Sequence, residues 1–170
     1  MIAVLQFDSV SLSLLETLLS KGLLPTLDGL RRRGSWMTLE TPATYLEGSA
    51  FHSLYTGTHA AEHGVYYPWM WSAGEQRVRF MEDFAIPPVV WERLTAAGLR
   101  SLIIDPYEIR APRTINGIYL GGWQFTNRVV MRSSSIPPST MRALRRDLGM
   151  PRRAEEIYGR PYMPELMRLR

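Results

Sequence analysis

The chain has 170 residues, of which 45% are hydrophobic and 21% charged, a balance typical of one soluble globular domain rather than a disordered chain. It contains no cysteine, which excludes disulfides, thiolate zinc sites and cysteine nucleophiles, so any metal ion must be bound by oxygen and imidazole ligands. The net charge of +4 comes entirely from residues 141–170, with 8 basic and 4 acidic residues against 12 of each before them, and we interpret this tail as a solvated helical face rather than a nucleic-acid-binding surface.

The N-terminal segment, residues 1–7, is an apolar run typical of a strand buried on both faces of a parallel sheet. Asp8 then falls at the carboxyl end of this strand, the edge at which ligand sites of open α/β sheets gather. The run has no positively charged start and is interrupted by Asp8 and Ser9, so it is not a signal peptide. No stretch approaches the roughly 18 apolar residues of a membrane span. We therefore expect a cytoplasmic protein without a membrane partner.

Two short helices and a second strand are predicted next. Leucines recur at helical spacing over residues 12–19, and Gly22 ends that helix. Pro25 begins a second helix, which ends at Gly34 after three arginines. Residues 36–39 are predicted to form a strand.

The middle of the chain combines a turn, a helix and an aromatic cluster. Residues 41–48 are turn-like, and residues 49–55 favour a helix that Gly57 closes. The amino end of that helix would point its dipole at a nearby anion. The aromatic residues within 66–71 are interpreted as core or as a pocket wall rather than as a surface for stacking nucleotides.

Further helices and strands alternate towards the C-terminus. A helix is predicted over residues 89–94 and ends at Gly98, and buried strands are predicted over residues 101–104, which lead into Asp105, and over residues 117–120.

A loop rich in serine and proline follows over residues 133–138, and Ser139 is predicted to cap a helix over residues 140–148. The alternation of strands and helices predicts an α/β fold with a mostly parallel sheet over residues 1–150. Residues 151–170 form a basic tail.

Several short motifs, in this order and spacing, resemble the opening of the type I phosphodiesterases, the nucleotide pyrophosphatases of the alkaline phosphatase superfamily. An apolar strand ends in an aspartate, a Leu-Pro-x-Leu helix follows, then a Thr-Gly segment with His-Gly shortly after it, and last a Trp-x-x-Leu helix before a strand. These motifs are Ile2 to Asp8, Leu24 to Leu27, Ser53 to Gly57, Glu62 to Val65, and Trp91 with Leu94 and Gly98. The resemblance covers most of residues 1–150.

The resemblance implies a fold and a chemistry. The fold is an alkaline-phosphatase-like three-layer sandwich around a mostly parallel sheet, of which this chain is the N-terminal portion. Two divalent metal ions, usually zinc, bind the phosphate ester, and a threonine or serine hydroxyl attacks phosphorus. Asp8 matches the metal-ligand aspartate of the first strand. The implied substrate is a small-molecule phosphate ester.

The nucleophile position departs from the family pattern. The nucleophile lies about nine residues before the threonine of Thr-Gly, and counting back from Thr56 gives Glu47. A glutamate cannot form the usual alkoxide, and its charge would repel a phosphate. Ser49 and Thr44 are hydroxyls close by, so a local shift of the loop would present either one. The alternatives are that Glu47 is itself a metal ligand or that the site is degenerate.

The other metal ligands of the superfamily are aspartates and histidines far downstream, yet the last histidine of this chain is His63. His63 corresponds to the His-Gly turn and is interpreted as structural, and His52, inside the predicted helix, as a core or surface residue. His59 does not replace the missing ligands. We therefore expect a truncated chain that is inactive in isolation.

Three functions are thus compared. The leading one is metal-dependent hydrolysis of phosphate esters, as in nucleotide pyrophosphatases. The alternative is a non-catalytic α/β binding module that keeps the fold and has lost the nucleophile and the metal site, which Glu47 favours. A nucleic-acid-binding protein comes third and is motivated only by the arginines of the tail. The sequence predicts neither a nucleic-acid partner nor an oligomeric state.

Overall fold

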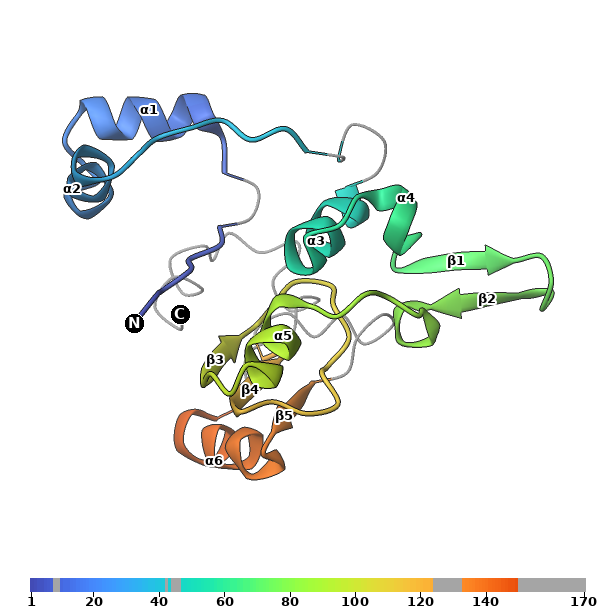
Figure 1. Ribbon diagram of the computed structural model, residues 1–170. Helices are drawn as coiled ribbons and strands as arrows, with labels where there is room; N and C mark the ends of the chain where they lie inside the picture. Colours follow the sequence, from blue (N-terminus) through green and yellow to red (C-terminus); the bar gives the residue numbers. More distant parts are fainter. Residues whose placement is uncertain (8–9, 42, 44–46, 124–132, 150–170) are drawn as a thin grey trace. The chain divides into compact units, whose positions relative to one another are not determined.

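The computed structural model describes residues 1–7, 10–41, 43, 47–123 and 133–149 (Figure 1). The side chains of Glu47 and Glu82 lie outside this description. The chain has two compact units, Met1–Glu40 and the residues from Thr41 onward. Every helix that the sequence predicts lies within the described ranges.

The first unit contains two helices, both as predicted. α1 (Leu12–Ser20) begins after Ser11, whose hydroxyl accepts the N–H of Leu14 at 3.4 Å and so satisfies a donor of the first turn. α2 (Pro25–Arg33) begins with proline, which loses nothing there because the first helical N–H has no partner within a helix. Asp28 accepts hydrogen bonds from two arginines of the same helix, Arg31 and Arg32.

The two strands predicted in this unit do not form. Residues 1–7 and 36–39 carry no strand assignment and are exposed, including the large apolar side chains of both segments. A strand exists only where its backbone pairs with a neighbour, and the described part of residues 1–40 provides helices alone. The prediction of buried strands from the apolar composition of these two segments is therefore wrong.

The second unit opens with two helices and an antiparallel hairpin. α3 (Glu47–Thr56) confirms the predicted helix, and α4 (Ala60–His63) follows it. β1 (Trp69–Ser72) then pairs with β2 (Arg77–Phe80), and the short turn η2 (Met81–Asp83) ends the hairpin. Neither strand was predicted from the sequence.

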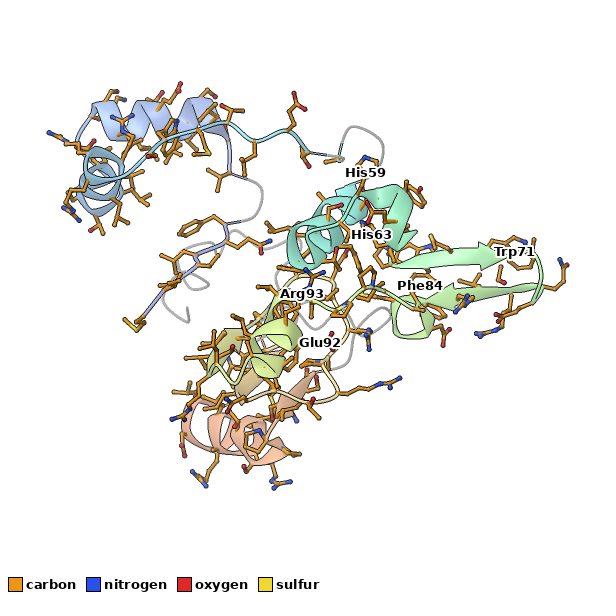
Figure 2. All side chains as sticks on the ribbon, in the orientation of Figure 1. His59, His63, Trp71, Phe84, Glu92 and Arg93 are labelled. Atoms are coloured by element: carbon orange, nitrogen blue, oxygen red, sulfur yellow. The ribbon has the colours of Figure 1, made fainter. Side chains whose placement is uncertain are left out.

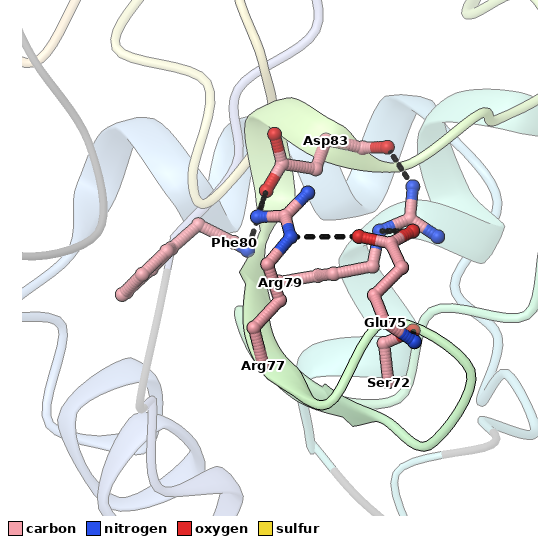
Figure 3. A network of polar contacts seen from close by, with 6 residues as sticks. All are labelled: Ser72, Glu75, Arg77, Arg79, Phe80 and Asp83. Carbon is pink, nitrogen blue, oxygen red and sulfur yellow. Dashed lines mark hydrogen bonds and ion pairs between the residues drawn. The ribbon is translucent and has the colours of Figure 1, made fainter.

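A set of ion pairs fixes the hairpin turn (Figure 3). The guanidinium of Arg77 donates to Glu75 at 2.7 Å and to Asp83 at 3.1 Å. The second oxygen of Glu75 pairs with Arg79 at 3.8 Å, and the carboxylate of Asp83 also accepts the N–H of Phe80 at 3.3 Å. These contacts tie the turn to both ends of β2.

The aromatic side chains of residues 66–71 are exposed, so the prediction that they form core is wrong, whereas a role as a pocket wall stays a prediction. Strand side chains alternate between faces, so Trp69 and Trp71 lie on one face with their partners Phe80 and Val78, and all four are exposed. Met70, on the other face, packs against the buried cluster of Val65, Met81 and Phe84. The pleat therefore partly buries the methionine and exposes the tryptophans.

A three-stranded sheet follows in the second unit, in the order β3-β4-β5. β3 (Ser101–Ile104) and β4 (Gly117–Gly121) are parallel and confirm two predicted strands. β5 (Ser134–Ile136) pairs antiparallel with β4, within the segment that was predicted to be a loop. The described sheets thus contain one parallel and two antiparallel pairs, and the observed class is mixed α/β.

α5 (Val90–Ala96) lies before β3 and confirms a predicted helix. α6 (Pro138–Leu148) begins earlier than expected, because Pro137 rather than Ser139 precedes its first turn, and Pro137 makes no side-chain cap. Among the described residues, no helix is long and apolar enough to cross a membrane.

The main buried cluster joins α3 to α5 and β3. Its buried members are Tyr55 of α3, Val89, Trp91 of α5 and Ile109. The rings of Tyr55 and Trp91 lie 5.1 Å apart, and the Tyr55 hydroxyl accepts the backbone N–H of Tyr107 at 3.0 Å. α3 is therefore held on one side by an aromatic core.

Candidate active site

The first turn of α3 lies against the chain that leads into β1. A side chain at Gly48 would meet the Tyr66 carbonyl oxygen at 3.2 Å and the Tyr67 Cα at 3.5 Å. Any larger residue would force the neighbouring backbone to shift by a few tenths of an ångström. Gly48 and its neighbour Ser49 are both buried.

His52 lies one turn further along α3 and is 1% exposed. Its Nδ1 lies 3.1 Å from the Gly48 carbonyl oxygen, which only accepts, so Nδ1 carries the proton and donates. Among the described residues, none offers a hydrogen bond to its buried Nε2. His52 is thus a core residue that bonds the backbone of the first turn.

His63 packs against this helix from the end of α4 (Figure 2). Its Nδ1 accepts the N–H of Val65 at 3.0 Å, which leaves the proton of the neutral ring on Nε2. Nε2 lies 3.0 Å from the Ser53 hydroxyl oxygen and therefore donates to it. A ring held in this tautomer supports the interpretation of His63 as a structural residue and not as a base for Ser53.

The Thr-Gly motif forms the carboxyl end of α3. Gly57 takes the left-handed conformation, with φ of 68°, and donates to the Ser53 carbonyl at 2.9 Å. The Thr56 hydroxyl is buried and donates to the His52 carbonyl at 2.7 Å. Arg93 of α5 donates to the Thr56 carbonyl at 3.0 Å (Figure 2). The motif therefore ends the helix and anchors it to α5.

The predicted nucleophile region is only partly described. Glu47 is the first residue of α3, which places it at a helix amino end, and its side chain lies outside the described part. Ser49 is 1% exposed, so a substrate reaches its hydroxyl only if the first turn is uncovered. Thr44 and the predicted metal ligand Asp8 lie outside the described residues.

No group of three His, Cys, Asp or Glu side chains that could hold a metal ion occurs in the described ranges. Nδ1 of His52 bonds the Gly48 carbonyl, and the two ring nitrogens of His63 bond Val65 and Ser53. The described residues therefore do not fit the two-zinc site that the family resemblance implies, and the three histidines do not form a substitute for it.

Burial shifts both buried histidines in the same direction. Desolvation lowers the pKa of His52, as does the nearby His63, against the opposing effect of the bond to Gly48. Desolvation also lowers the pKa of His63, with His59 adding to the shift, while a bond to the Ser49 backbone and the charge of Glu62 oppose it. The folded chain thus keeps both rings neutral to lower pH than an unfolded chain does.

Acidification is expected to destabilise the second unit. Because the unfolded chain takes up protons on its histidines near pH 6.5 and the folded chain does so only at lower pH, the free energy of unfolding falls as the pH drops below about 6.5. The slope is at most about 1.4 kcal/mol per pH unit for each histidine. Urea denaturation at pH 7.5 and 5.5 measures it. A midpoint that is unchanged or rises at pH 5.5 would contradict the assignment.

The model of one protein family, type I phosphodiesterase / nucleotide pyrophosphatase, matches residues 2–158. The chain belongs to this family. No curated protein and no solved structure matches it. The matched range includes Asp8, the whole of α3 and the histidines around it. Membership of the phosphodiesterase family therefore agrees with the resemblance drawn from the short motifs.

Sequence reasoning missed one feature of this site. The bond between His52 and Gly48 joins residues four apart, a spacing that places them on the same face of a helix. That spacing was present in the sequence, but the burial that makes the bond important depends on contacts with distant segments.

Proposed function

We propose that the chain carries the nucleophile region and the first metal ligand of a metal-dependent hydrolase of phosphate esters, of the nucleotide pyrophosphatase type. The observation that carries the proposal is the family match over residues 2–158, with Glu47, the residue at the counted nucleophile position, as the first residue of α3. The first backbone N–H groups of a helix have no partner within it, and they point with the positive end of the dipole at an anion. A phosphoryl group suits such a position.

Each candidate residue has a proposed role. Asp8 supplies an oxygen ligand to a divalent metal ion, one of two zinc ions in the family pattern. A hydroxyl of Ser49 or Thr44 attacks phosphorus, the alcohol of the ester leaves, and water then releases the phosphoryl group from the hydroxyl. Glu47 is the remaining candidate of the nucleophile region, and its proposed role is that of a metal ligand beside the attacking hydroxyl. The substrates are small-molecule phosphate esters, and the protein acts in the cytoplasm.

The remaining part of the proposal concerns the fold. We assign the described elements to an alkaline-phosphatase-like three-layer sandwich, whose metal site would need aspartate and histidine ligands that the described residues do not supply. The domain comprises residues 1–150, and residues 151–170 continue from it.

Hydrolysis of bis-p-nitrophenyl phosphate tests this function, with the full chain as its gene encodes it and with zinc or manganese added. Loss of even an outer partner of a metal ligand costs about 10- to 100-fold in affinity or activity. We therefore expect Asp8→Asn to lower the rate by more than about 100-fold.

Asp28→Asn is the matched control, because the Asp28 carboxylate bonds arginines of its own helix and has no proposed part in the site. It should keep the wild-type rate. A folded, metal-loaded full chain without turnover, or equal rates for Asp8→Asn and Asp28→Asn, would contradict the proposal.

A second candidate function is a non-catalytic binding module that has kept the fold. The glutamate at the nucleophile position and the burial of Ser49 favour it. This candidate predicts no turnover with any divalent metal and no zinc binding in a calorimetric titration of the full chain. Measurable metal-dependent turnover would exclude it.

A further inference from the structure

Two buried histidines converge on the first turn of α3, although neither is placed to take a proton from a substrate. His52 is 1% exposed and His63 is 4% exposed, and their ring centroids are 5.7 Å apart. Each is bonded to this turn or to the helix just after it. The Gly48 carbonyl fixes the proton of His52 on Nδ1, and the Val65 N–H fixes that of His63 on Nε2. They come from different elements, α3 and the end of α4.

The bond from His52 acts on the backbone between two candidate residues. Gly48 lies between Glu47 and Ser49, and its carbonyl accepts from His52 Nδ1 at 3.1 Å. Burying the other nitrogen, Nε2, without a partner among the described residues costs stability that an apolar side chain would not cost. What the imidazole adds, compared with a phenylalanine of similar volume, is the Nδ1 donor.

The bonds of His63 connect the same turn to the chain after it. The ring reaches the Ser53 hydroxyl at 3.0 Å and the backbone of Ser49, while its other nitrogen accepts the Val65 N–H. Val65 is in turn buried in the cluster that carries the hairpin. The first turn is thus held from within α3 by one histidine and from outside by the other.

We propose that His52 and His63 are positioning residues, which together hold the backbone of Gly48 and Ser49 in the geometry that phosphoryl transfer requires. The inference rests on the proposed function for its effect on rate. It assigns neither ring a role as a general base. Both residues restrain the backbone of the first turn of α3. Each does so only in one tautomer, with the proton on Nδ1 of His52 and on Nε2 of His63.

Two variants of His52 separate the donor from the ring. The amide nitrogen of His52→Asn occupies about the position of Nδ1 and restores the donor, whereas His52→Phe keeps the ring and removes the donor. Because a small misplacement of a reacting group costs up to about 100-fold in rate, we expect His52→Phe to lower kcat by about 10- to 100-fold with KM unchanged. His52→Asn should recover most of kcat.

His59→Asn is the matched control. His59 is exposed, caps α4 by accepting the Ala61 N–H at 3.2 Å, and lies outside the first turn of α3. An asparagine can cap the helix in the same way, so kcat should not change. Equal kcat in wild type and His52→Phe, or equal loss in His52→Phe and His52→Asn, would overturn the proposal.

A second readout does not depend on activity. Nitrogen NMR of the imidazole rings should show the two stated tautomers, and amide exchange at residues 48–52 should accelerate in His52→Phe but not in His59→Asn. A proton on Nε2 of His52, or unchanged exchange, would refute the positioning role even in an active enzyme. An inactive wild type with these signals present would instead refute the proposed function, and with it the effect on rate, while the hold on the turn would stand.

Discussion

Replacing Gly117 by alanine is expected to destabilise the second unit by about 3 kcal/mol, because the substitution combines backbone strain with a clash. Gly117 has φ of 140°, a conformation that residues with a side chain rarely adopt. An added Cβ would overlap the carbonyl oxygen of Ser101 and lie 2.9 Å from its carbonyl carbon. Ser101 is the residue paired with Gly117 in the parallel register of β3 and β4, so neither backbone can move without breaking the sheet.

Gly74→Ala provides the matched control for this prediction. Gly74 lies in the turn between β1 and β2, its φ is not in the left-handed region, and an added Cβ meets nothing within 4 Å. Its free energy of unfolding should stay within about 0.5 kcal/mol of the wild type. Urea denaturation followed by circular dichroism measures both variants. Similar midpoints for Gly117→Ala and Gly74→Ala would show that the parallel pair is wrongly registered.

The substitution Trp91→Ala is expected to cost about 3 to 5 kcal/mol, the range for removing a large aromatic side chain from a core. Trp91 is 3% exposed and packs on Tyr55, the residue that joins α3 to the core. Its loss would leave a cavity next to the helix that carries the proposed nucleophile region. In the full chain, the proposed activity should therefore fall together with stability on warming.

The same substitution at Trp71 tests whether burial is the cause. Trp71 is 61% exposed on the hairpin (Figure 2), so Trp71→Ala removes as many atoms but leaves no cavity. We expect a change within about 0.5 kcal/mol, measured by the same denaturation experiment. A loss for Trp71→Ala as large as for Trp91→Ala would mean that the exposed face of the hairpin is covered in solution.

The sequence predicted those elements that local chemistry determines. α1 and α2 follow from their leucine spacing and from the proline and glycine at their boundaries, and α3 from the glycine that ends it. β3 was predicted with the bounds it has, because a short apolar run follows the glycine after a helix and leads into Asp-Pro. In these cases the local pattern and the three-dimensional environment agree.

The failures arise where the structure depends on partners distant in sequence. The apolar residues 1–7 were predicted to form a strand, but a strand requires a paired neighbour that the described part of their unit does not contain. β5 was overlooked because its serines are poor strand formers, yet β4 provides an edge for it to pair with. The pleat of β1, which turns Met70 towards the buried cluster and leaves Trp71 exposed, is likewise set by β2.

The position of the candidate site was predicted from the sequence, but the contacts within it were not. Counting from Thr56 located Glu47, and the structure makes that residue the start of a helix. The contacts of His52 and His63 with the backbone of Gly48 and Ser49 were not predicted. They depend on the packing of α4 against α3 and on the burial of both rings. Asp8 and Thr44 lie outside the described residues, and their roles stay predictions.

Calorimetric titration of zinc into the full chain tests most directly whether Asp8 serves as a metal ligand. We expect the wild type and Asp28→Asn to bind zinc alike and Asp8→Asn to bind it at least about 100-fold more weakly, because a direct ligand is lost. Zinc affinity that is the same with and without the Asp8 carboxylate would show that Asp8 is not a metal ligand.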